Sequence, residues 1–323
     1  MGGLQNGLDS GLPRVMAIIN RTPDSFYDKG ATFAFDAAVQ RCREVVQAGA
    51  TIVDVGGVKA GPGDDVDPQE EIDRVVPFIA VVHEQLAGMT ADGTDPTAAT
   101  DPTAATETTA APGETSEARE TRSGATIDIS VDTWRPEVAE AAVQAGATLI
   151  NDTWAGYEPE LVEVAGAHKV GYVCSHTGGA TPRTRPHRVH YDDVVADVIR
   201  ETTALAERAV ACGVPEEKVF IDPTHDFGKN TFHGLEILRR IDEVVATGWP
   251  VLMALSNKDF IGETTGRPVG ERVAGTLAAT AWCAARGVAA FRVHEVAETI
   301  DVIRTIAAIQ GTARPLDTTR GLA

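Results

Sequence analysis

The chain alternates between short apolar runs and longer stretches whose apolar residues recur at helical spacing. Eight of the short runs are rich in Val, Ile and Leu, and a helical pattern follows each of them. Such runs are typical of buried strands, and regular alternation of strands with helices is typical of a parallel sheet. Eight units predict a single-domain α/β fold, the (β/α)8 or TIM barrel, which needs about 250 residues. We expect strands at Val15–Ile19, Thr51–Val53, Ile127–Val131, Thr148–Ile150, Val170–Val173, Val219–Ile221, Val251–Leu255 and Ala289–Val293.

Nearly every predicted strand ends in a polar residue, which a buried strand would not select for packing. The carboxyl ends of barrel strands form the active face in this fold, so these side chains predict one site. They are Asn20, Asp54, Asp132, Asn151, His176, Asp222, Ser256 with Lys258, and Arg292 with His294.

Three of these residues, Asp132, Asn151 and Asp222, suggest a heterocycle site. A carboxylate at the end of a buried strand is costly unless it accepts strong hydrogen bonds. Two carboxylates and an amide around one cavity suit a flat ligand rich in donors, such as a 2-aminopyrimidinone edge. The alternative is that each residue caps the following helix, since Asp and Asn are favoured N-caps. We favour the ligand site because all three lie on the same rim.

The pattern R-V-H at Arg292–His294 places both cationic side chains on one side of a strand. Together with the Asn20 amide they predict an anion site at the rim, where barrels often bind phosphate. Lys258 adds a further cation. In the alternative reading, Arg292 pairs with an acid of the core.

Composition limits the partners of the chain. Its 323 residues are 43% hydrophobic and carry a formal net charge of −19, which argues against binding to nucleic acid or an anionic membrane. An anionic substrate therefore needs a local cluster of donors. The four cysteines form no C-x-x-C pair and no spacing resembles a zinc site, so a phosphate-linked Mg²⁺ is the metal to consider. Without a signal peptide or an apolar run of about 18 residues, we expect a cytoplasmic protein.

One segment, residues 88–124, lacks apolar periodicity and repeats DPTAAT directly, so we expect it to be disordered. It joins the second helix, predicted at Pro68–Ala87, to the third strand and should emerge on the amino-terminal face. We expect the barrel to span residues 14–311, with flexible ends at 1–13 and 312–323. The small residues of Gly275–Gly287 fit a subunit interface or plain helix packing equally well.

At these positions the chain resembles the dihydropteroate synthases, the pterin-binding barrels of folate synthesis. The resemblance implies a transferase that joins p-aminobenzoate to 6-hydroxymethyl-7,8-dihydropterin diphosphate and releases diphosphate. It also implies a homodimer. The motifs that carry it are INRTPDSF (Ile19–Phe26), DVGG (Asp54–Gly57), SVDTW (Ser130–Trp134), IND (Ile150–Asp152), DP…FGK (Asp222–Lys229), LSNKDFIG (Leu255–Gly262) and RVHEV (Arg292–Val296).

The resemblance also implies roles for individual residues. The diphosphate would be bound by Asn20, Arg292 and His294, with Mg²⁺ near Asn20. These three residues and Lys258 would form the catalytic set. The pterin would be bound by Asp54, Asp132, Asn151, Asp222, Phe227 and Lys258.

The loops that should hold the co-substrate depart from the family pattern. The usual G-G-E-S-T-R-P-G loop has Lys59, Ala60 and Gly61 in place of Ser, Thr and Arg, and Asp259 replaces the last Ser of S-R-K-S. A lysine does not reproduce the bidentate fork of an arginine. We therefore keep open a weak synthase, a paralogue that binds a pterin without turnover, and a transferase for a differently charged acceptor. An unrelated metal-dependent barrel hydrolase is the most distant alternative.

Overall fold

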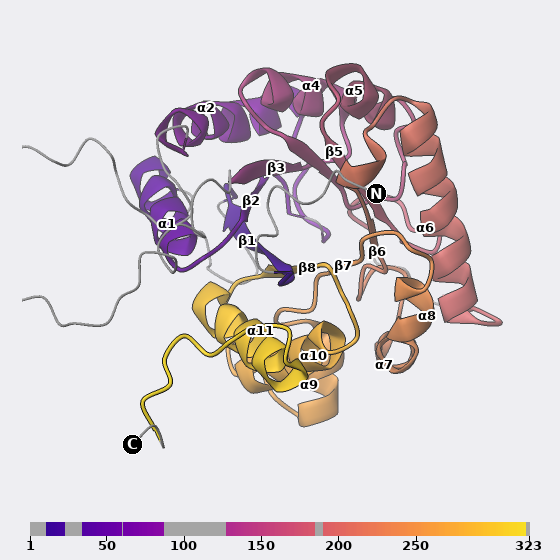
Figure 1. Cartoon of the computed structure of the whole chain (residues 1–323). Helices are drawn as coiled ribbons and strands as arrows, with labels where there is room; N and C mark the ends of the chain where they lie inside the picture. Colours follow the sequence, from indigo (N-terminus) through magenta and orange to yellow (C-terminus); the bar gives the residue numbers. More distant parts are fainter. Residues whose placement is uncertain (1–10, 23–33, 60, 87–126, 185–189, 321–323) are drawn as a thin grey trace, which may run out of the picture.

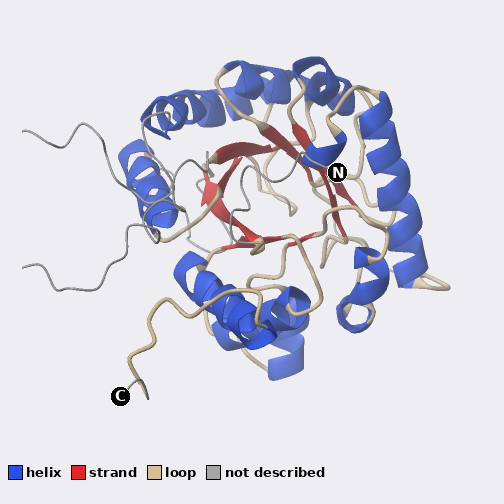
Figure 2. Cartoon of the chain, viewed as in Figure 1, coloured by secondary structure: helices blue, strands red, loops and turns tan. Residues whose placement is uncertain are grey.

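A computed structural model describes residues 11–22, 34–59, 61–86, 127–184 and 190–320. Within these residues, eight parallel strands form one sheet that curves into a barrel, with helices outside it (Figures 1 and 2). The predicted TIM barrel is thereby confirmed. The strands are β1 (Arg14–Asn20), β2 (Ile52–Gly56), β3 (Asp128–Asp132), β4 (Leu149–Asp152), β5 (Gly171–Ser175), β6 (Val219–Asp222), β7 (Leu252–Met253) and β8 (Ala290–Val293).

The strand order is β6-β5-β4-β3-β2-β1-β8-β7, so every strand pairs with its neighbour in sequence or, for β1, also with β8. A single bridge between Ile221 and Val251 joins β6 to the residue before β7 and completes the ring. The prediction for β7 was too long. Its chain leaves the sheet after Met253 because Ser256 and Asn257 turn to contact Glu295.

Helices cover the outer surface of the ring. They pack against the outward side chains of the strands in one large cluster of mainly Val, Ile, Leu and Ala. None of the described helices is both long and apolar enough to cross a membrane. The helices are α1 (Phe35–Gln47), α2 (Pro68–Leu86), α4 (Pro136–Gln144), α5 (Leu161–His168), α6 (Val194–Ala211), α7 (Thr231–Arg239), α8 (Ile241–Val245), α9 (Asp259–Thr265), α10 (Val273–Ala284) and α11 (Val296–Gln310), with a 3-10 turn at Glu216–Lys218.

The inward side chains change character along the barrel axis. The layer nearest the amino ends is apolar and is formed by Met16, Ile52, Leu149, Val173, Phe220, Leu252 and Ala290. Since side chains alternate along a strand, the next inward residue lies two positions further on. That layer includes Asp54, Ser130, Asn151, Asp222 and Arg292. The barrel is thus sealed at one end and polar at the other, which fixes where a ligand enters.

Several predicted features fall outside the described residues. These are the insertion at 88–124, most of the N-terminal segment 1–13, and Ala60 of the β2 loop. The described part of the C-terminal segment, residues 312–320, contains neither helix nor strand. The ordered elements run from Arg14 in β1 to Gln310 in α11, and the domain limits 14–311 remain a prediction.

Candidate functional site

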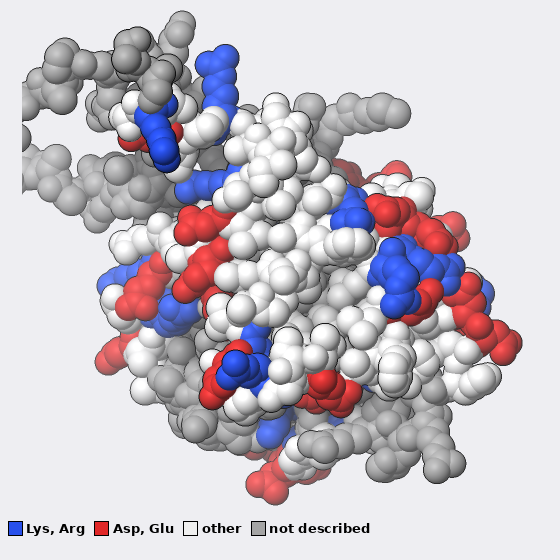
Figure 3. All heavy atoms as spheres, turned by 90° about the horizontal axis from the view of Figure 1, so that it is seen from below, with Lys and Arg blue, Asp and Glu red and all other residues white. Residues whose placement is uncertain are grey.

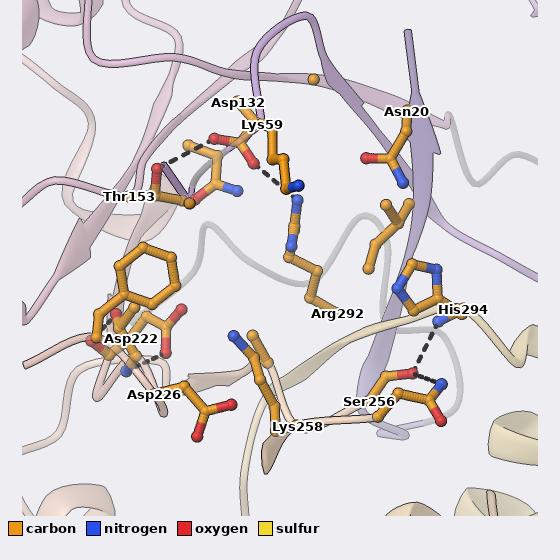
Figure 4. Close-up of a pocket in the computed structure, with 18 of the residues that line it drawn as sticks. Asn20, Lys59, Asp132, Thr153, Asp222, Asp226, Ser256, Lys258, Arg292 and His294 are labelled. Atoms are coloured by element: carbon orange, nitrogen blue, oxygen red, sulfur yellow. Dashed lines mark hydrogen bonds and ion pairs between the residues drawn. The ribbon is translucent and has the colours of Figure 1, made fainter. Parts of the chain in front are cut away.

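A cavity of about 290 Å³ opens at the carboxyl ends of the strands (Figure 4). All but two of the site residues predicted from the sequence line it, and they come from β1, β3, β4, β6 and β8 and from the loops after β6, β7 and β8. The residues brought together are Asn20, Asp132, Asn151, Asp222, Phe227, Lys258, Arg292 and His294.

One exception is His176, which is buried and lies 2.8 Å from the Asp197 carboxylate of α6, away from the cavity. The other is Asp54, which lies inside β2 beneath the cavity with no exposed surface. Its carboxylate accepts hydrogen bonds from Ser130 Oγ at 2.6 Å, from Asn151 Nδ2 at 3.3 Å, and from Arg292 Nε at 2.6 Å. Asp54 therefore holds two of the cavity residues in place, and it touches none of the open space.

Arg292 bridges two carboxylates. Its Nε lies 2.6 Å from Asp54 and its Nη2 lies 2.7 Å from Asp132, so the alternative that this arginine pairs with a core acid is correct. Burial by itself would lower the pKa of Arg292, but the two carboxylates outweigh it and raise the pKa above its ordinary value. The guanidinium is therefore a fixed part of the cavity floor, with two of its nitrogens already committed.

Burial raises the pKa of Asp132, and the neighbouring Arg292 opposes that rise. Burial also raises the pKa of Asp222, which is opposed by its hydrogen bond from the Thr224 backbone and by Lys258. Neither residue caps a helix. The N-caps of α4, α5 and α7 are Arg135, Glu160 and Asn230, so the capping alternative is wrong.

Lys258 reaches the cavity because of the turn before it. Asn257 has a left-handed backbone (φ 58°), a conformation that non-glycine residues adopt only when their surroundings enforce it. Here the enforcement comes from Glu295, which accepts hydrogen bonds from Asn257 Nδ2 and Ser256 Oγ, both at 2.7 Å. Lys258 Nζ then lies 5.0 Å from the centroid of the Phe227 ring. No other described residue bonds this ammonium.

A second lysine, the half-buried Lys229, supports the wall of the cavity at Phe227. Lys229 Nζ donates to the carbonyl oxygens of His176 at 2.7 Å, Phe227 at 2.9 Å and Thr224 at 3.2 Å. These contacts join the loop after β5 to the loop after β6. Burial lowers the pKa of Lys229 to about 7, with Asp222 opposing the shift. The sequence analysis did not identify this role, because the carbonyl groups that define it leave no trace in residue type.

The mouth of the cavity carries charged residues from three loops. Lys59 and Gly61 lie on the β2 side, and Asp226 and Asp259 lie on the side of Lys258. Asp259 is paired with Arg272 at 3.0 Å, and its backbone N–H donates to Asp226 at 2.8 Å. The mouth thus brings together a cation from one loop and carboxylates from two others.

Some lining residues had no sequence signal. Thr153 donates to Asp132 at 3.1 Å, and Ile18 and Ala254 add apolar surface. Ser175 at the end of β5 is fully buried and does not line the cavity.

Asn20 and His294 lie together on one side of the cavity (Figure 4). No group of three or more His, Cys, Asp or Glu residues suited to a metal ion occurs among the described residues. One amide oxygen is too few ligands for a protein-built Mg²⁺ cage, but it suits an ion that arrives bound to phosphate oxygens and keeps its waters. Mg²⁺ therefore fits this site only as a companion of a phosphate ligand.

Fold and site together define a (β/α)8 barrel with a cavity at the carboxyl ends of its strands that is lined by carboxylates, amides and cations. The chain belongs to the pterin binding enzyme family, whose model matches residues 16–105 and 117–294.

Known proteins agree with this assignment. A Mycobacterium leprae protein named inactive dihydropteroate synthase 2 is 54% identical over 96% of this chain and 94% of its own length. The Staphylococcus haemolyticus dihydropteroate synthase is 33% identical over 91% of this chain and 93% of its own. Among solved structures, the Xanthomonas albilineans dihydropteroate synthase with 4-aminobenzoic acid is 35% identical, covers 93% of each chain and has a TM-score of 0.73.

Proposed function

We propose that this chain is a dihydropteroate synthase-type transferase of low activity. It would bind 6-hydroxymethyl-7,8-dihydropterin diphosphate in the cavity and join it to p-aminobenzoate, with release of diphosphate. The observation that supports this most is the convergence of Asp132, Asn151, Asp222 and Lys258 on one cavity. The carboxylates and the amide accept from the N–H groups of a 2-aminopyrimidinone, and the lysine donates to its carbonyl oxygen.

The same residues support a transfer without a protein nucleophile. The bond between the pterin methylene carbon and the diphosphate oxygen breaks, and the diphosphate leaves with the electron pair. The arylamine nitrogen then bonds to that carbon and loses a proton. Asn20 and His294 would orient the leaving group, and a Mg²⁺ held there by Asn20 would neutralise part of its charge.

We expect the reaction to be slow because Gly61 contributes no side chain where the family pattern has an arginine. Loss of one donor to the transition state typically costs about 10²–10³ in rate. The test is to incubate the purified chain with the pterin diphosphate, p-aminobenzoate and Mg²⁺ and to quantify dihydropteroate chromatographically. Product should form roughly 10²–10³-fold more slowly than with the Escherichia coli enzyme. The variant Asp222→Asn should form no product. Failure of the folded wild-type chain to form any product at saturating substrate would refute the proposal.

A second candidate is a protein that binds the pterin without turnover. It is favoured by the carboxylates Asp226 and Asp259 at the mouth, which disfavour an acceptor bearing its own carboxylate, and by the name of the M. leprae relative. Calorimetry with 6-hydroxymethylpterin separates the candidates: heat of binding without product in the assay above supports this one, whereas product formation excludes it.

We further propose a cytoplasmic homodimer. The four cysteines are all free thiols, as expected in a reducing compartment. Helix α10 contains no charged residue, yet its Trp282 is 43% exposed. Figure 3 shows an uncharged strip across the face of the molecule on the side of α9, α10 and α11. Light scattering after gel filtration should give twice the chain mass of 34.0 kDa.

A further inference from the structure

Asp152 ends β4 directly after Asn151, and the two side chains point to opposite faces of the strand. Asn151 lines the cavity, whereas Asp152 does not line it and is 1% exposed. The Asp152 carboxylate accepts a hydrogen bond at 2.7 Å from the hydroxyl of Tyr172, a residue of the cluster between the strands and the helices. Asp152 therefore acts on the site through the groups that it bonds.

The carboxylate of Asp152 holds the loop that follows β4. It accepts from the backbone N–H of Trp154 at 3.0 Å and from that of Gly156 at 2.6 Å. Ala155, between these two residues, has a left-handed backbone (φ 57°), which an alanine adopts only when its surroundings enforce it. Because the two hydrogen bonds flank Ala155, we attribute its conformation to Asp152.

This loop places Trp154 against the aromatic wall of the cavity. The Trp154 ring is buried and packs edge to face with Phe227, with the two ring centroids 5.1 Å apart. Lys258, which lines the cavity, lies 5.0 Å from the centroid of the same Phe227 ring. Trp154 itself does not line this cavity. The Phe227 ring thus has a cation on the side of the cavity and an indole behind it.

Packing alone does not hold Trp154 in this place. Its other ring contact is with Trp134, at 6.4 Å between centroids. The loop also borders a second cavity, of about 530 Å³, which is lined by Trp154, Ala155 and Tyr157 together with residues of the loop after β5 and of α6. Open space on this side gives the ring room to turn away from Phe227, so its position depends on the hydrogen bonds of its loop.

We propose that Asp152 is a positioning residue of the candidate site, which fixes the loop after β4 so that Trp154 backs Phe227 and the cavity keeps a rigid wall for a flat ring. The identification of that ring as a pterin rests on the proposed function; the positioning of Trp154 does not. Because Asp152 acts on the wall through Trp154, replacement of either residue should remove the same contribution to ligand affinity. A merely structural role would lower stability and leave the affinity unchanged.

The experiment is a calorimetric titration of 6-hydroxymethylpterin into the wild-type chain, Asp152→Asn, Trp154→Leu and the double variant. Asparagine keeps the shape of the side chain but accepts at one oxygen only, so one loop N–H loses its partner. We expect Asp152→Asn to weaken pterin binding by about three- to tenfold, the range of one lost aromatic contact. Trp154→Leu should weaken it equally, and Asp152→Asn should add nothing in the Trp154→Leu background, since the two residues act as one unit.

Tyr172→Phe is the matched control. It removes a hydrogen bond to the same carboxylate but neither of the two bonds to the loop. We expect a lower midpoint of urea denaturation with unchanged pterin affinity. If Tyr172→Phe weakens pterin binding as much as Asp152→Asn does, the role of Asp152 is structural and the inference is overturned. Asp152→Ser, whose hydroxyl accepts from one loop N–H, repeats the test if Asp152→Asn does not fold.

Acrylamide quenching of tryptophan fluorescence tests the positioning without a ligand. Asp152→Asn should raise the share of the emission that acrylamide quenches, and it should cause no such rise in the Trp154→Leu background. If the wild type binds no pterin but the quenching behaves in this way, the proposed function fails and this inference stands. Unchanged quenching in Asp152→Asn, or unchanged pterin affinity in that variant when the wild type binds pterin, overturns the inference.

Discussion

At Arg292, one guanidinium is shared by two carboxylates in the interior of the barrel. Asp54 has no exposed surface, and the side chains of Arg292 and Asp132 are 17% and 18% exposed. A buried ion pair adds little net stability, because desolvation offsets the attraction, yet removal of one partner leaves an uncompensated charge. The cluster therefore fixes the shape of the cavity floor more than it stabilises the fold.

Replacement of Arg292 by Met should lower the free energy of unfolding by about 3–5 kcal/mol at pH 8, where Asp54 and Asp132 are left charged without a cation. This loss of stability should be smaller at pH 5 than at pH 8. Burial raises the pKa of Asp132, so at the lower pH its carboxyl group takes up a proton in the folded state. Urea denaturation at both pH values measures this. Arg267→Met, which removes an exposed partner of Glu271, is the control and should cost less than about 1 kcal/mol. An equal loss at the two pH values would contradict the argument.

At the scale of elements, the loops after β5 and β6 behave as one unit because Lys229 bonds carbonyl groups from both. Gly228 makes their close approach possible: a Cβ there would lie 1.9 Å from the Thr177 carbonyl oxygen. Tyr191 adds a hydrogen bond from its hydroxyl to the Gly228 carbonyl at 2.6 Å. The aromatic wall at Phe227 is therefore held from behind by backbone contacts.

The variant Lys229→Met should leave the His176 and Phe227 carbonyl groups without this donor, while the Thr224 carbonyl keeps the Phe227 N–H. The chain should be destabilised by about 2–4 kcal/mol, at about 1–3 kcal/mol for each unsatisfied group. The variant should also weaken pterin binding, because Phe227 loses its support. Urea denaturation and calorimetry test both effects. Lys218→Met, which removes an exposed lysine that donates to the Lys169 carbonyl, is the matched control, with an expected change under about 0.5 kcal/mol. Unchanged stability together with unchanged ligand affinity would show that the two loops hold together without the lysine.

Elements of the barrel were predictable where a local pattern carries the information. The alternation in β1 that puts Val15, Ala17 and Ile19 toward the helices follows from strand periodicity and was visible in the sequence. The depth at which Asp54 lies, at the bottom of the site, could not be predicted in this way. Asp54 was expected at the end of its strand, but β2 continues to Gly56, so its carboxylate lies a layer deeper. Pairing geometry, which decides this depth, depends on β1 and β3 and has no local signature.

The walls of the site were the least predictable part. Asp226 and Thr224 have positive φ angles of 71° and 50°, a conformation that a β-branched threonine gives no reason to expect. They are imposed by contacts between distant loops, such as the bond from the Asp259 N–H to the Asp226 carboxylate. Residue type predicted most of the charged and amide side chains that reach the cavity, and tertiary contacts decided how they are held.

For the whole molecule, acid is the condition that should unfold the barrel. His225 has no exposed surface, and its Nε2 lies 3.2 Å from the Gly234 carbonyl oxygen. Burial, with a contribution from Lys229, lowers its pKa to about 3. Unfolding restores an ordinary pKa of about 6.5, so between these values the unfolded chain binds a proton that the folded chain excludes. The stability that His225 confers as a neutral group is therefore complete above about pH 6.5 and is lost as the pH falls.

Each pH unit in this window costs about 1.4 kcal/mol for one such group. Because the Nε2 atom faces a carbonyl oxygen, the neutral ring donates there, and Gln retains a comparable donor without titrating. We expect the free energy of unfolding of the wild type to fall more steeply between pH 6.5 and pH 4.5 than that of His225→Gln. The difference in slope should equal about one bound proton. Denaturation curves at half-unit steps give both slopes directly. Parallel slopes would mean that His225 is already protonated in the folded barrel. Any acid sensitivity would then be caused by other groups, such as the buried His176, whose pKa is lowered by burial to about 4.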